Sequence, residues 1–582
     1  MKPAGHLLVE CLLAQGVDTA FGVPGESYLA VLDGLHEHSD RIRFITCRQE
    51  GGAAFMAEAY GKLTGRPGVC MVTRGPGATN ASIGVHTAFQ DSTPMVLLVG
   101  DVGADMRDRE AFQELDFGHF FGPGTRGMAK RVERIDDARR IPEYVARAFA
   151  TACQGRPGPV VLVLPEDMLT QQVDAQPLQR GPEVCSQIPQ RFLSDLQSLL
   201  SNSKRPMVIA GGAGWTPDAA RDLQRFAERW QLPVGNAFRF QDTFDNHHAQ
   251  YAGDVGIGIN PALAQRIREA DLVLALGVRL GEMTTGGYTL QQAPRPHQQL
   301  VHLHVNPEEL GRVYQPDLAL CANTGEALQA LASLALPAHW AAHGQVPWAR
   351  WCADAAADYR ACLQPQALPG LPAEGPGVVD MPAIVATLQR HLPEDAVLTN
   401  GAGNFASWLH RYYRYHGLAK GHKTQLAPTN GAMGYGVPAG IAASLVTGRT
   451  VFTIAGDGDF LMNGQELATA VQHGGPTLIV LLNNGMYGTI RMHQEREYPT
   501  HISGSQLANP DFCALARAYG YAAERVERTE QFEAALLRAL AALAAGQGTL
   551  IEIPLSPEII TTRGTLRAIT EAAQQRQAAA GA

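Results

Sequence analysis

The sequence predicts an α/β protein built from three doubly wound parallel-sheet domains. Short apolar runs alternate with helix-like stretches along most of the chain, which is typical of parallel sheets covered by helices on both faces. The chain has 582 residues, more than one hydrophobic core usually organises, so several domains are expected. Apolar residues make up 45% of the chain and glycines number 61, as in globular enzymes with many turns.

The first predicted domain covers residues 1–170. Four apolar runs in it have the character of buried parallel strands, and helix-like stretches near 50–64 and 78–88 separate them. These strands are Phe44–Thr46, Val69–Val72, Met95–Val99 and Val160–Leu164. The polar, proline-bearing stretch 171–190 follows and predicts a linker.

Two more α/β domains are predicted at 191–335 and 378–556, with a proline- and glycine-rich linker at 365–377 between them. The tail, 557–582, is rich in Ala and Gln and is either a docked helix or a frayed end. The first and third domains have a similar length and alternation, as a duplicated architecture would have. The predicted strands are Pro206–Ala210, Asp271–Leu276 and Leu300–Val305 in the second domain, and Val451–Ala455, Thr477–Leu482 and Leu550–Ile553 in the third.

Charge and composition exclude several classes of partner. The net charge of −9 gives no reason to expect nucleic acid or a membrane surface. The first residues, MKPAGHLLVECLLAQG, are interrupted by Glu10 and predict an amphipathic helix rather than a signal peptide. No run approaches the roughly 18 apolar residues of a membrane span. The 9 cysteines include no C-x-x-C pair, so no disulfide framework is expected and a reducing cytoplasm is the simplest location.

The sharpest motif is Gly456-Asp457-Gly458, which follows the apolar run VFTIA. It pairs with Asn483-Asn484, which follows the apolar run TLIVLL. Both motifs lie at the carboxyl ends of predicted strands, where open α/β sheets bind ligands. Glycines allow backbone N–H groups to approach phosphate oxygens. Asp457, Asn484 and the carbonyl of Met486 offer the oxygen ligands that Mg²⁺ prefers. The sequence therefore predicts a magnesium and diphosphate site here.

A helix predicted over Gly464–His473 would turn its N-terminus toward the anion. The alternative is that the two motifs are unrelated turns, because Gly-Asp-Gly and Asn-Asn are both common turn sequences. The strand before each motif and the separation between them favour the joint site.

Glu50 is a lone acid that opens a helix of small residues directly after the strand FIT. An acid in such an apolar setting is a candidate proton-transfer group, since burial raises the pKa of a carboxyl. The alternative is a glutamate that stabilises the helix dipole. Glu58, on the same helix, is assigned a structural role.

These motifs resemble the signature of thiamine-diphosphate enzymes, and nearly the whole chain resembles the catalytic subunit of acetolactate synthase. Similar segments include FGVPGES (21–27), TRGPGATN (73–80), AFQE (111–114) and GAMGYGVPAG (431–440), with Arg74 where the family has Ser. The resemblance implies that Glu50 binds N1′ of the cofactor's aminopyrimidine and so promotes loss of the thiazolium C2 proton.

The resemblance also implies the remaining site residues. Gln113 would line the active site, unless it is a surface loop residue, and Met433 would lie under the cofactor, unless it is ordinary core. Lys130 is either a contact to the substrate carboxylate or a solvated lysine. Asp457, Asn484 and Met486 would bind the metal, and the cofactor contacts would be Pro24, Gly25, Glu50, Asn80, Gly403, Asn404, Phe405, Gly431, Met433, Gly456, Asp457, Gly458, Asp459, Asn484, Met486 and Tyr487. Asn404 and Phe405 replace family side chains, which places their side-chain contacts to diphosphate in doubt.

The implied function is a decarboxylase and carboligase of 2-oxo acids that uses thiamine diphosphate and Mg²⁺. The family arrangement brings Glu50 to a cofactor held by another subunit, which implies a homodimer or a homotetramer. His493 stands where biosynthetic relatives carry a substrate-selecting Trp, so a preference for 2-oxobutyrate is unsupported, and a lid role is expected for it. Arg279 matches the family's FAD pattern in part, whereas Asn306 replaces its acidic residue and argues against FAD.

Three alternatives remain open from the sequence. The first is a 2-oxo acid decarboxylase that releases aldehyde without carboligation, and the second is an FAD-linked enzyme of the pyruvate oxidase kind. The third is a non-catalytic homologue, against which the joint presence of Glu50, Asp457 and Asn484 argues.

Overall fold

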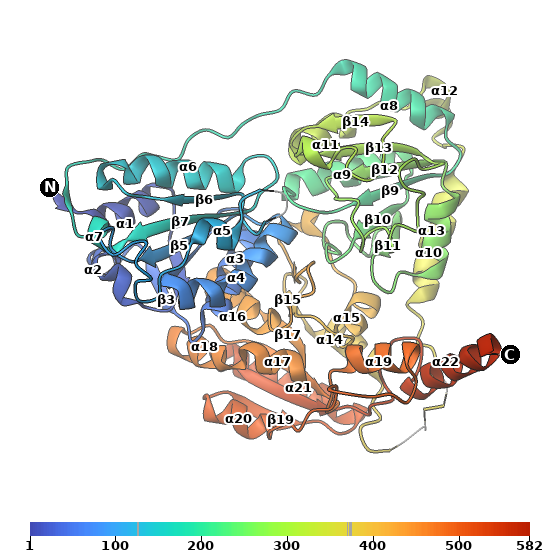
Figure 1. Cartoon of the computed structure of the whole chain (residues 1–582). Coiled ribbons are helices and arrows are strands. Elements are labelled where there is room, and N and C mark those ends of the chain that lie inside the picture. Colours follow the sequence, from blue (N-terminus) through green and yellow to red (C-terminus); the bar gives the residue numbers. More distant parts are fainter. Residues whose placement is uncertain (125–126, 369, 372–374, 582) are drawn as a thin grey trace.

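Three parallel sheets form the framework of the molecule (Figure 1), and each sheet has six strands. The computed structural model describes residues 1–124, 127–368, 370–371 and 375–581. Part of the second predicted linker and the last residue of the predicted tail lie outside this range. The predicted fold class, three doubly wound parallel-sheet domains, is confirmed.

The N-terminal sheet has the strand order β3-β2-β4-β5-β7-β6. All four predicted strands are present, and the predicted helix at 50–64 is α3 (Glu50–Thr64). Two strands had no apolar run to predict them, namely the short β2 and the charged edge strand β6. The strands are β2 (Thr19–Gly22), β3 (Arg43–Thr46), β4 (Gly68–Thr73), β5 (Met95–Asp101), β6 (Arg131–Arg134) and β7 (Pro159–Pro165).

The C-terminal sheet repeats this topology. Its strand order is β16-β15-β17-β18-β20-β19, which is the order of the N-terminal sheet when the strands of each are counted along the chain. The shared order supports the duplicated architecture that the sequence indicates. The strands are β15 (Val397–Asn400), β16 (Gln425–Leu426), β17 (Val451–Gly456), β18 (Leu478–Asn483), β19 (Ala522–Arg525) and β20 (Thr549–Pro554).

The central sheet differs, with the order β11-β10-β9-β12-β13-β14. The chain builds outward from β9 and then from β12, so the switch point lies between these two strands. Helix α13 (Ala349–Cys362) packs on β11, so packing of the central unit continues past residue 335. The strands are β9 (Pro206–Ala210), β10 (Val234–Ala237), β11 (Tyr251–Val255), β12 (Leu272–Leu276), β13 (Gln299–His304) and β14 (Leu318–Cys321).

A long extended segment joins the first two units. Strand β8 (Gln172–Val173) pairs with β1 (Lys2–Pro3), and the chain then has neither helix nor strand up to α8 (Gln190–Asn202). Figure 1 shows this segment running across the gap between the N-terminal and central units, as the predicted linker at 171–190 requires.

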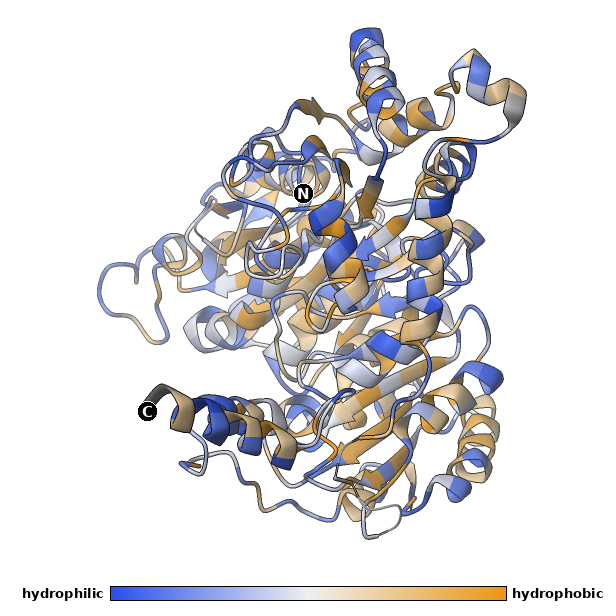
Figure 2. Ribbon diagram, turned by 90° about the vertical axis from the view of Figure 1, so that its right-hand side faces the viewer, coloured by the Kyte–Doolittle hydropathy of each residue, from blue (hydrophilic) through white to orange (hydrophobic). Residues whose placement is uncertain are grey.

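The N-terminal and C-terminal units share one hydrophobic core, in which α3 packs on α4 (Arg74–Asp91) and on α16 (Gly436–Thr447). Small residues permit this approach, since a Cβ on Gly84 would lie 2.4 Å from that of Ala54. Figure 2 shows hydrophobic residues concentrated in the strands. Glu58 is buried in this interface and accepts hydrogen bonds from Tyr435 (2.6 Å) and Thr93 (2.7 Å), so its role is structural, as predicted.

The C-terminal tail forms a docked helix. Helix α22 (Leu566–Gly581) packs on α19 (Gly488–Glu497), and Ala573 on its inner face is buried. Among the described helices, none combines the length and apolarity that crossing a membrane requires.

Candidate active site

The predicted residues of the N-terminal domain follow four neighbouring strands of its sheet, β3-β2-β4-β5. Pro24 and Gly25 follow β2, Glu50 follows β3, Asn80 lies on the helix after β4, and Gln113 follows β5. Because the carboxyl ends of parallel strands share one edge, the sheet brings these residues to one side. We call this set the pyrimidine half-site.

Glu50 is the first residue of α3, but it does not cap the helix. The side chain of Gln49 accepts hydrogen bonds from the N–H groups of Gly51 (2.6 Å) and Gly52 (3.1 Å). The carboxylate of Glu466, from the C-terminal unit, accepts from the N–H groups of Arg48 (3.1 Å) and Gln49 (2.9 Å). The helix start is therefore capped by other residues, which weakens the purely structural alternative for Glu50.

Among the residues that the structure describes, the Glu50 carboxylate has one side-chain hydrogen-bond partner. Asn80 Nδ2 donates to Glu50 Oε2 at 2.9 Å, and Oε1 lies close to Gly77, where a Cβ would be 3.6 Å away. Glu50 is half-buried in the single chain, and Asn80 is exposed. One carboxylate oxygen is thus fixed in place while the other remains available.

Arg74, the departure from the family segment, holds two loops of this half-site together. Its guanidinium forms ion pairs with Glu26 (2.7 Å) and Glu166 (2.8 Å) and is largely buried. The next residue, Gly75, donates its N–H to the carbonyl of Gln113 at 2.9 Å. Gln113, half-buried at a φ of 66°, is therefore held beside the early loop.

The predicted residues of the C-terminal domain occupy the equivalent edge of its own sheet. They follow the four neighbouring strands β16-β15-β17-β18, which correspond to the four strands of the pyrimidine half-site. We call this set the diphosphate half-site. It comprises Gly431 and Met433 after β16, Gly403, Asn404 and Phe405 after β15, Gly456, Asp457, Gly458 and Asp459 at and after the end of β17, and Asn484, Met486 and Tyr487 after β18.

Asp457 is buried and bound by several donors. It accepts hydrogen bonds from the N–H groups of Gly458 (3.0 Å) and Gly485 (2.8 Å) and from Nδ2 of Asn509 (2.7 Å). Burial raises the pKa of this carboxyl above its usual value, and the hydrogen bonds oppose that shift. A dication would favour the charged form further.

Asn484, Met486 and Asn509 each have an oxygen atom that accepts no hydrogen bond within the described residues. Within the described residues no hydrogen bond reaches the side chain of Asn484 or the carbonyl of Met486, which leaves both oxygens available. Among the described residues, the buried Oδ1 of Asn509 has no hydrogen-bond partner. The donor set fits Mg²⁺, which prefers carboxylate, amide and carbonyl oxygens. Asn509, in LANPDF, was missed because Asn before Pro is an ordinary turn sequence.

The helix after the glycine motif starts earlier than predicted. Helix α17 (Asp457–Asn463) begins at Asp457 itself, and α18 (Leu467–His473) follows after a short 3-10 turn. The expected helix over Gly464–His473 is therefore wrong at its start, because the aspartate and its neighbours already have helical backbone.

Asp459 joins two loops of the diphosphate half-site. Its Oδ1 accepts from the N–H groups of Ala402 (3.1 Å) and Gly434 (2.9 Å), while the buried Oδ2 has no hydrogen-bond partner in the part of the chain that the structure describes. A Cβ on Gly401 would lie 2.0 Å from Oδ1, so the loop must carry glycine there. Burial raises the pKa of Asp459 to about 7.

Two aromatic rings cover Gly403, Gly456 and Gly458 of this half-site. Cβ atoms on Gly456 and Gly403 would lie 2.7 Å and 2.6 Å from the ring of Phe405, and one on Gly458 would lie 2.5 Å from that of Tyr487. Asn404 is engaged elsewhere, since its Oδ1 accepts from Thr489 at 3.0 Å. The side-chain differences noted from the sequence are therefore accommodated by packing.

Other candidates lie away from these sets. Lys130 Nζ donates to the carbonyls of Thr151 and Gln154 (2.6 Å) at the end of α6 (Ile141–Cys153), so its ammonium group is engaged at that helix end, and a substrate contact stays a prediction. His493 is exposed on α19 and lies 2.6 Å from Arg496, which leaves its lid role a prediction. Arg279 donates to the carbonyl of Gln90 at 2.7 Å, and Asn306 caps the turn at Glu308.

Three segments of the chain match the domains of one known protein family. Its residues 2–120 match the thiamine pyrophosphate enzyme N-terminal TPP binding domain, residues 193–331 match the central domain, and residues 401–553 match the C-terminal TPP binding domain. The two half-sites thus lie in or beside the two segments described as TPP binding.

Individual relatives agree. The chain is 31% identical to the acetolactate synthase isozyme 2 large subunit of Escherichia coli (strain K12), covering 91% of this chain and 92% of that protein. It is 32% identical to the acetolactate synthase large subunit of Parasynechococcus marenigrum (strain WH8102), covering 92% of this chain and 85% of that protein. It is 31% identical to acetolactate synthase 1, chloroplastic, of Nicotiana tabacum, covering 93% of this chain and 80% of that protein. The alternative of a non-catalytic homologue is accordingly set aside. The chain belongs to the thiamine pyrophosphate enzyme family and is a thiamine-diphosphate-dependent enzyme similar to the large subunits of acetolactate synthase.

Proposed function

We propose that this enzyme decarboxylates a 2-oxo acid and joins the remaining fragment to a second carbonyl compound. The observation that carries the proposal is the matched placement of Glu50 and of the pair Asp457 and Asn484 on equivalent edges of two duplicated sheets. The names of the relatives, acetolactate synthases, agree with carboligation.

The diphosphate half-site would hold the cofactor through a cation. Asp457, Asn484 and the Met486 carbonyl would bind Mg²⁺, and Asn509 would keep the Asp457 carboxylate in position. Bound thiamine diphosphate would supply the electron sink for the carbon that loses the carboxylate. Met433 and the rings of Phe405 and Tyr487 would exclude water beside it.

Glu50 would manage a proton on the pyrimidine side. Its Oε2 is fixed by Asn80, so its Oε1 is the atom that would hold and share the proton. A covering partner would bury the half-exposed carboxyl, and burial favours the protonated form of an acid. Gln113, held by Gly75, would face the incoming substrate from the same edge.

We propose that the two half-sites meet between two copies of the chain. Within the described chain, no hydrogen bond links the pyrimidine half-site to the diphosphate half-site. Each is bordered by exposed apolar side chains, namely Ile83 near Asn80, and Leu461, Met462 and Ile490 beside the diphosphate half-site, which a partner would cover. A homodimer is therefore the minimum assembly, and a homotetramer would be a dimer of dimers.

Mixing two inactive variants tests this arrangement. If sites form between chains, a hybrid of Glu50→Gln and Asp457→Asn subunits contains one site with both residues intact. Unfolding and refolding the two variants together should then restore part of the activity, whereas each variant alone stays inactive. No restoration in proven hybrids would place both half-sites in one chain.

FAD is the less favoured cofactor. A cavity of about 1370 Å³ borders Gly212, Gly214 and Thr324 at the carboxyl ends of the central strands, so space for a nucleotide exists. Arg279 is already bonded to Gln90, however, and lies 3.7 Å from Glu309. The absorbance spectrum of the purified protein decides the point, since an FAD-linked oxidase would be yellow and would consume oxygen.

Product analysis tests the reaction itself. The enzyme with thiamine diphosphate and Mg²⁺ is given a panel of 2-oxo acids, and the products are identified by NMR. Acetolactate or acetoin from pyruvate supports carboligation, whereas acetaldehyde alone would establish the simple decarboxylase. We propose a cytoplasmic location, because all 9 cysteines are free and none needs oxidation.

A further inference from the structure

A row of polar side chains leads from Asp457 across the C-terminal sheet to its edge. Asn483 ends β18, Glu552 lies within β20 and Arg525 ends β19, and these three neighbouring strands lie next to β17. Glu552 is in register with Arg525 on one side and with Leu481 on the other. Asn483 comes two positions after Leu481 and therefore shares its face of the sheet. We call Asn483, Glu552 and Arg525 the polar row.

Glu552 is an ionisable side chain inside an otherwise apolar strand. Only 1% of it is exposed, and a buried charge is costly unless partners satisfy it. Arg525 donates two hydrogen bonds to its Oε2, at 3.0 and 3.1 Å, and Nδ2 of Asn483 donates to its Oε1 at 2.8 Å. Because a carboxylate can only accept hydrogen bonds, Asn483 must turn its NH₂ group toward Glu552.

The orientation of Asn483 sets the orientation of Asn509. With its NH₂ group turned to Glu552, Asn483 presents Oδ1 on its other side, where it accepts from Nδ2 of Asn509 at 2.9 Å. The same Nδ2 donates to Oδ2 of Asp457 at 2.7 Å. Since the donor and the acceptor of an amide are different atoms, the direction of each hydrogen bond in this series follows from the carboxylate of Glu552.

We propose that Glu552 is a positioning residue for the metal-binding carboxylate of Asp457 and acts through Asn483 and Asn509. The inference rests on the proposed magnesium site. A reversed Asn509 amide would set its oxygen against an oxygen of Asp457, whereas the observed orientation leaves Oδ1 of Asn509 buried, with no hydrogen-bond partner among the described residues. Because Mg²⁺ usually keeps bound waters in protein sites, this oxygen is a suitable acceptor for one of them. Asn483, the first residue of the Asn483-Asn484 motif, thereby gains a function.

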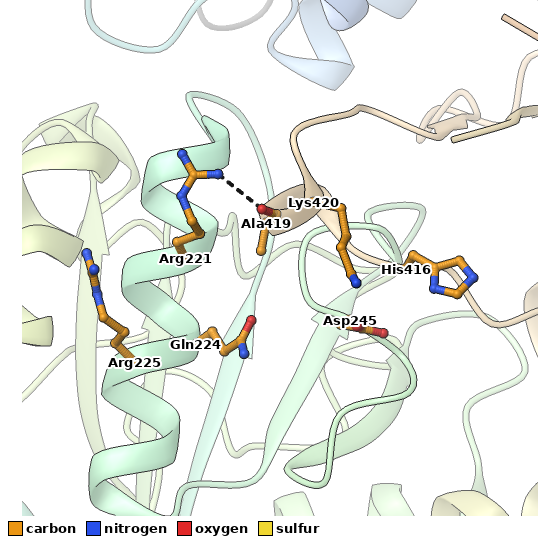
Figure 3. Close-up of a pocket in the computed structure, with 7 residues that line it drawn as sticks. All are labelled: Arg221, Gln224, Arg225, Asp245, His416, Ala419 and Lys420. Carbon is orange, nitrogen blue, oxygen red and sulfur yellow. Dashed lines mark hydrogen bonds between the residues drawn. The ribbon is translucent and has the colours of Figure 1, made fainter. Parts of the chain in front are cut away.

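A second arginine–carboxylate pair, on the central domain, has no such continuation. Figure 3 shows Arg225 on α9 (Pro217–Trp230), beside a cavity of about 280 Å³. Arg225 pairs with the largely buried Asp222, much as Arg525 pairs with Glu552. Within the described residues, however, no hydrogen bond leads from the Asp222 carboxylate to the diphosphate half-site. Asp222→Asn is therefore a matched control for neutralising a buried carboxylate.

The test measures the affinity of the full chain for Mn²⁺ by electron paramagnetic resonance, with thiamine diphosphate in excess. Mn²⁺ suits the same oxygen ligands as Mg²⁺. Glu552→Gln keeps the shape of the side chain, but its NH₂ group must face either Arg525 or Asn483, and the second choice reverses the amides of Asn483 and Asn509. We expect Mn²⁺ binding to weaken about 10- to 100-fold, while kcat at saturating Mg²⁺ stays close to that of the wild type. A packing role alone would not separate metal affinity from kcat.

A second substitution should restore the series of hydrogen bonds. In the double variant Glu552→Gln with Asn483→Asp, the new aspartate accepts from both the new glutamine and Asn509, and the glutamine oxygen accepts from Arg525. The total charge equals that of the wild type, so most of the lost Mn²⁺ affinity should return. Asn509→Ala should weaken Mn²⁺ binding as Glu552→Gln does, and Asp222→Asn should bind as the wild type does. Circular dichroism and Tm check the folding of each variant.

The possible failures are distinguishable. Wild-type Mn²⁺ affinity in Glu552→Gln and Asn509→Ala, or no gain of affinity in the folded double variant, overturns the positioning role and leaves the magnesium site standing. A wild-type protein that binds no Mn²⁺ in the presence of thiamine diphosphate overturns the proposed magnesium site, and the role of the polar row with it.

Discussion

The side-chain amide of Asn80 donates a hydrogen bond of 2.9 Å to Oε2 of Glu50. This contact joins α3 to α4, the helices that follow β3 and β4 on either side of β2, and it fixes the carboxylate to which we assign proton transfer. Asn80→Ala should lower kcat about 10- to 100-fold, because the carboxylate loses its orientation. Steady-state kinetics test this, with Ser82→Ala on the same helix as the control.

The variant Asn80→Asp tests the same contact through the pH dependence of kcat. A second carboxylate beside Glu50 disfavours its charged form, so the alkaline limb of the kcat profile, where the protonated acid is lost, should move to higher pH. A full rate in Asn80→Ala together with an unmoved profile in Asn80→Asp would remove Asn80 from the proposed proton path.

In the diphosphate half-site, the binding of Mg²⁺ should strengthen the binding of thiamine diphosphate. Asn484→Ala removes a predicted ligand without breaking any hydrogen bond in the described part of the chain, so cofactor affinity in Mg²⁺ should fall at least about tenfold with little change in Tm. Calorimetric titration of thiamine diphosphate measures this, and EDTA should release the cofactor from the wild type. Unchanged affinity in the variant would exclude Asn484 as a ligand. Asp511→Asn, an exposed helix cap, is the control.

Asp459 should act as a positioning residue for both cofactor loops. Asp459→Ala leaves the N–H groups of Ala402 and Gly434 unpaired, which should cost about 1–3 kcal/mol in stability and weaken cofactor binding. Asp459→Asn keeps an accepting oxygen and should remain close to the wild type. Thermal unfolding and cofactor titration of the pair separate the lost acceptor from the lost charge. Equal loss in both variants would show that the charge matters instead.

Buried histidines of the central sheet should make the protein sensitive to acid. Burial lowers the pKa of His304 to about 4, below the usual 6.5, so the folded state favours the neutral ring. The contribution of His304 to the free energy of unfolding is fully present above pH 6.5. It falls as the pH drops toward 4, by up to about 1.4 kcal/mol per pH unit. His304→Gln should flatten the fall in Tm over this range, whereas His36→Gln, on the surface, should not. An unchanged slope in His304→Gln would contradict the assignment.

Buried strands were predictable because a strand covered on both faces is a continuous apolar run. The run VFTIA falls within β17, and all of TLIVLL except its first residue falls within β18. The polar residues that follow these runs lie at the sheet edge, as expected. Edge strands were not predictable in this way. Residues 131–134 (RVER) and 522–525 (AAER) are only partly buried, so their charged side chains hide the pattern.

Contacts between distant parts of the chain were beyond the sequence. Glu466 caps the start of α3 from more than 400 positions away, and nothing local to GQEL indicates that partner. Asn509 reaches Asp457 across a loop, and Lys130 turns to the end of α6 because the fold places those carbonyls beside it. The sequence located chemical groups that follow strands, whereas the residues that position them depend on packing.

The most direct test of the account is the rate at which bound thiamine diphosphate exchanges its C2 proton, measured by quenched-flow NMR in the wild type and in Glu50→Gln. Glutamine keeps the shape and the Asn80 contact but cannot hold the proton at Oε1. If Glu50 is the activating acid, exchange in Glu50→Gln should be slower by about 100-fold or more, with cofactor affinity nearly unchanged. Exchange at the wild-type rate in Glu50→Gln would contradict the assignment of Glu50 as the activating acid.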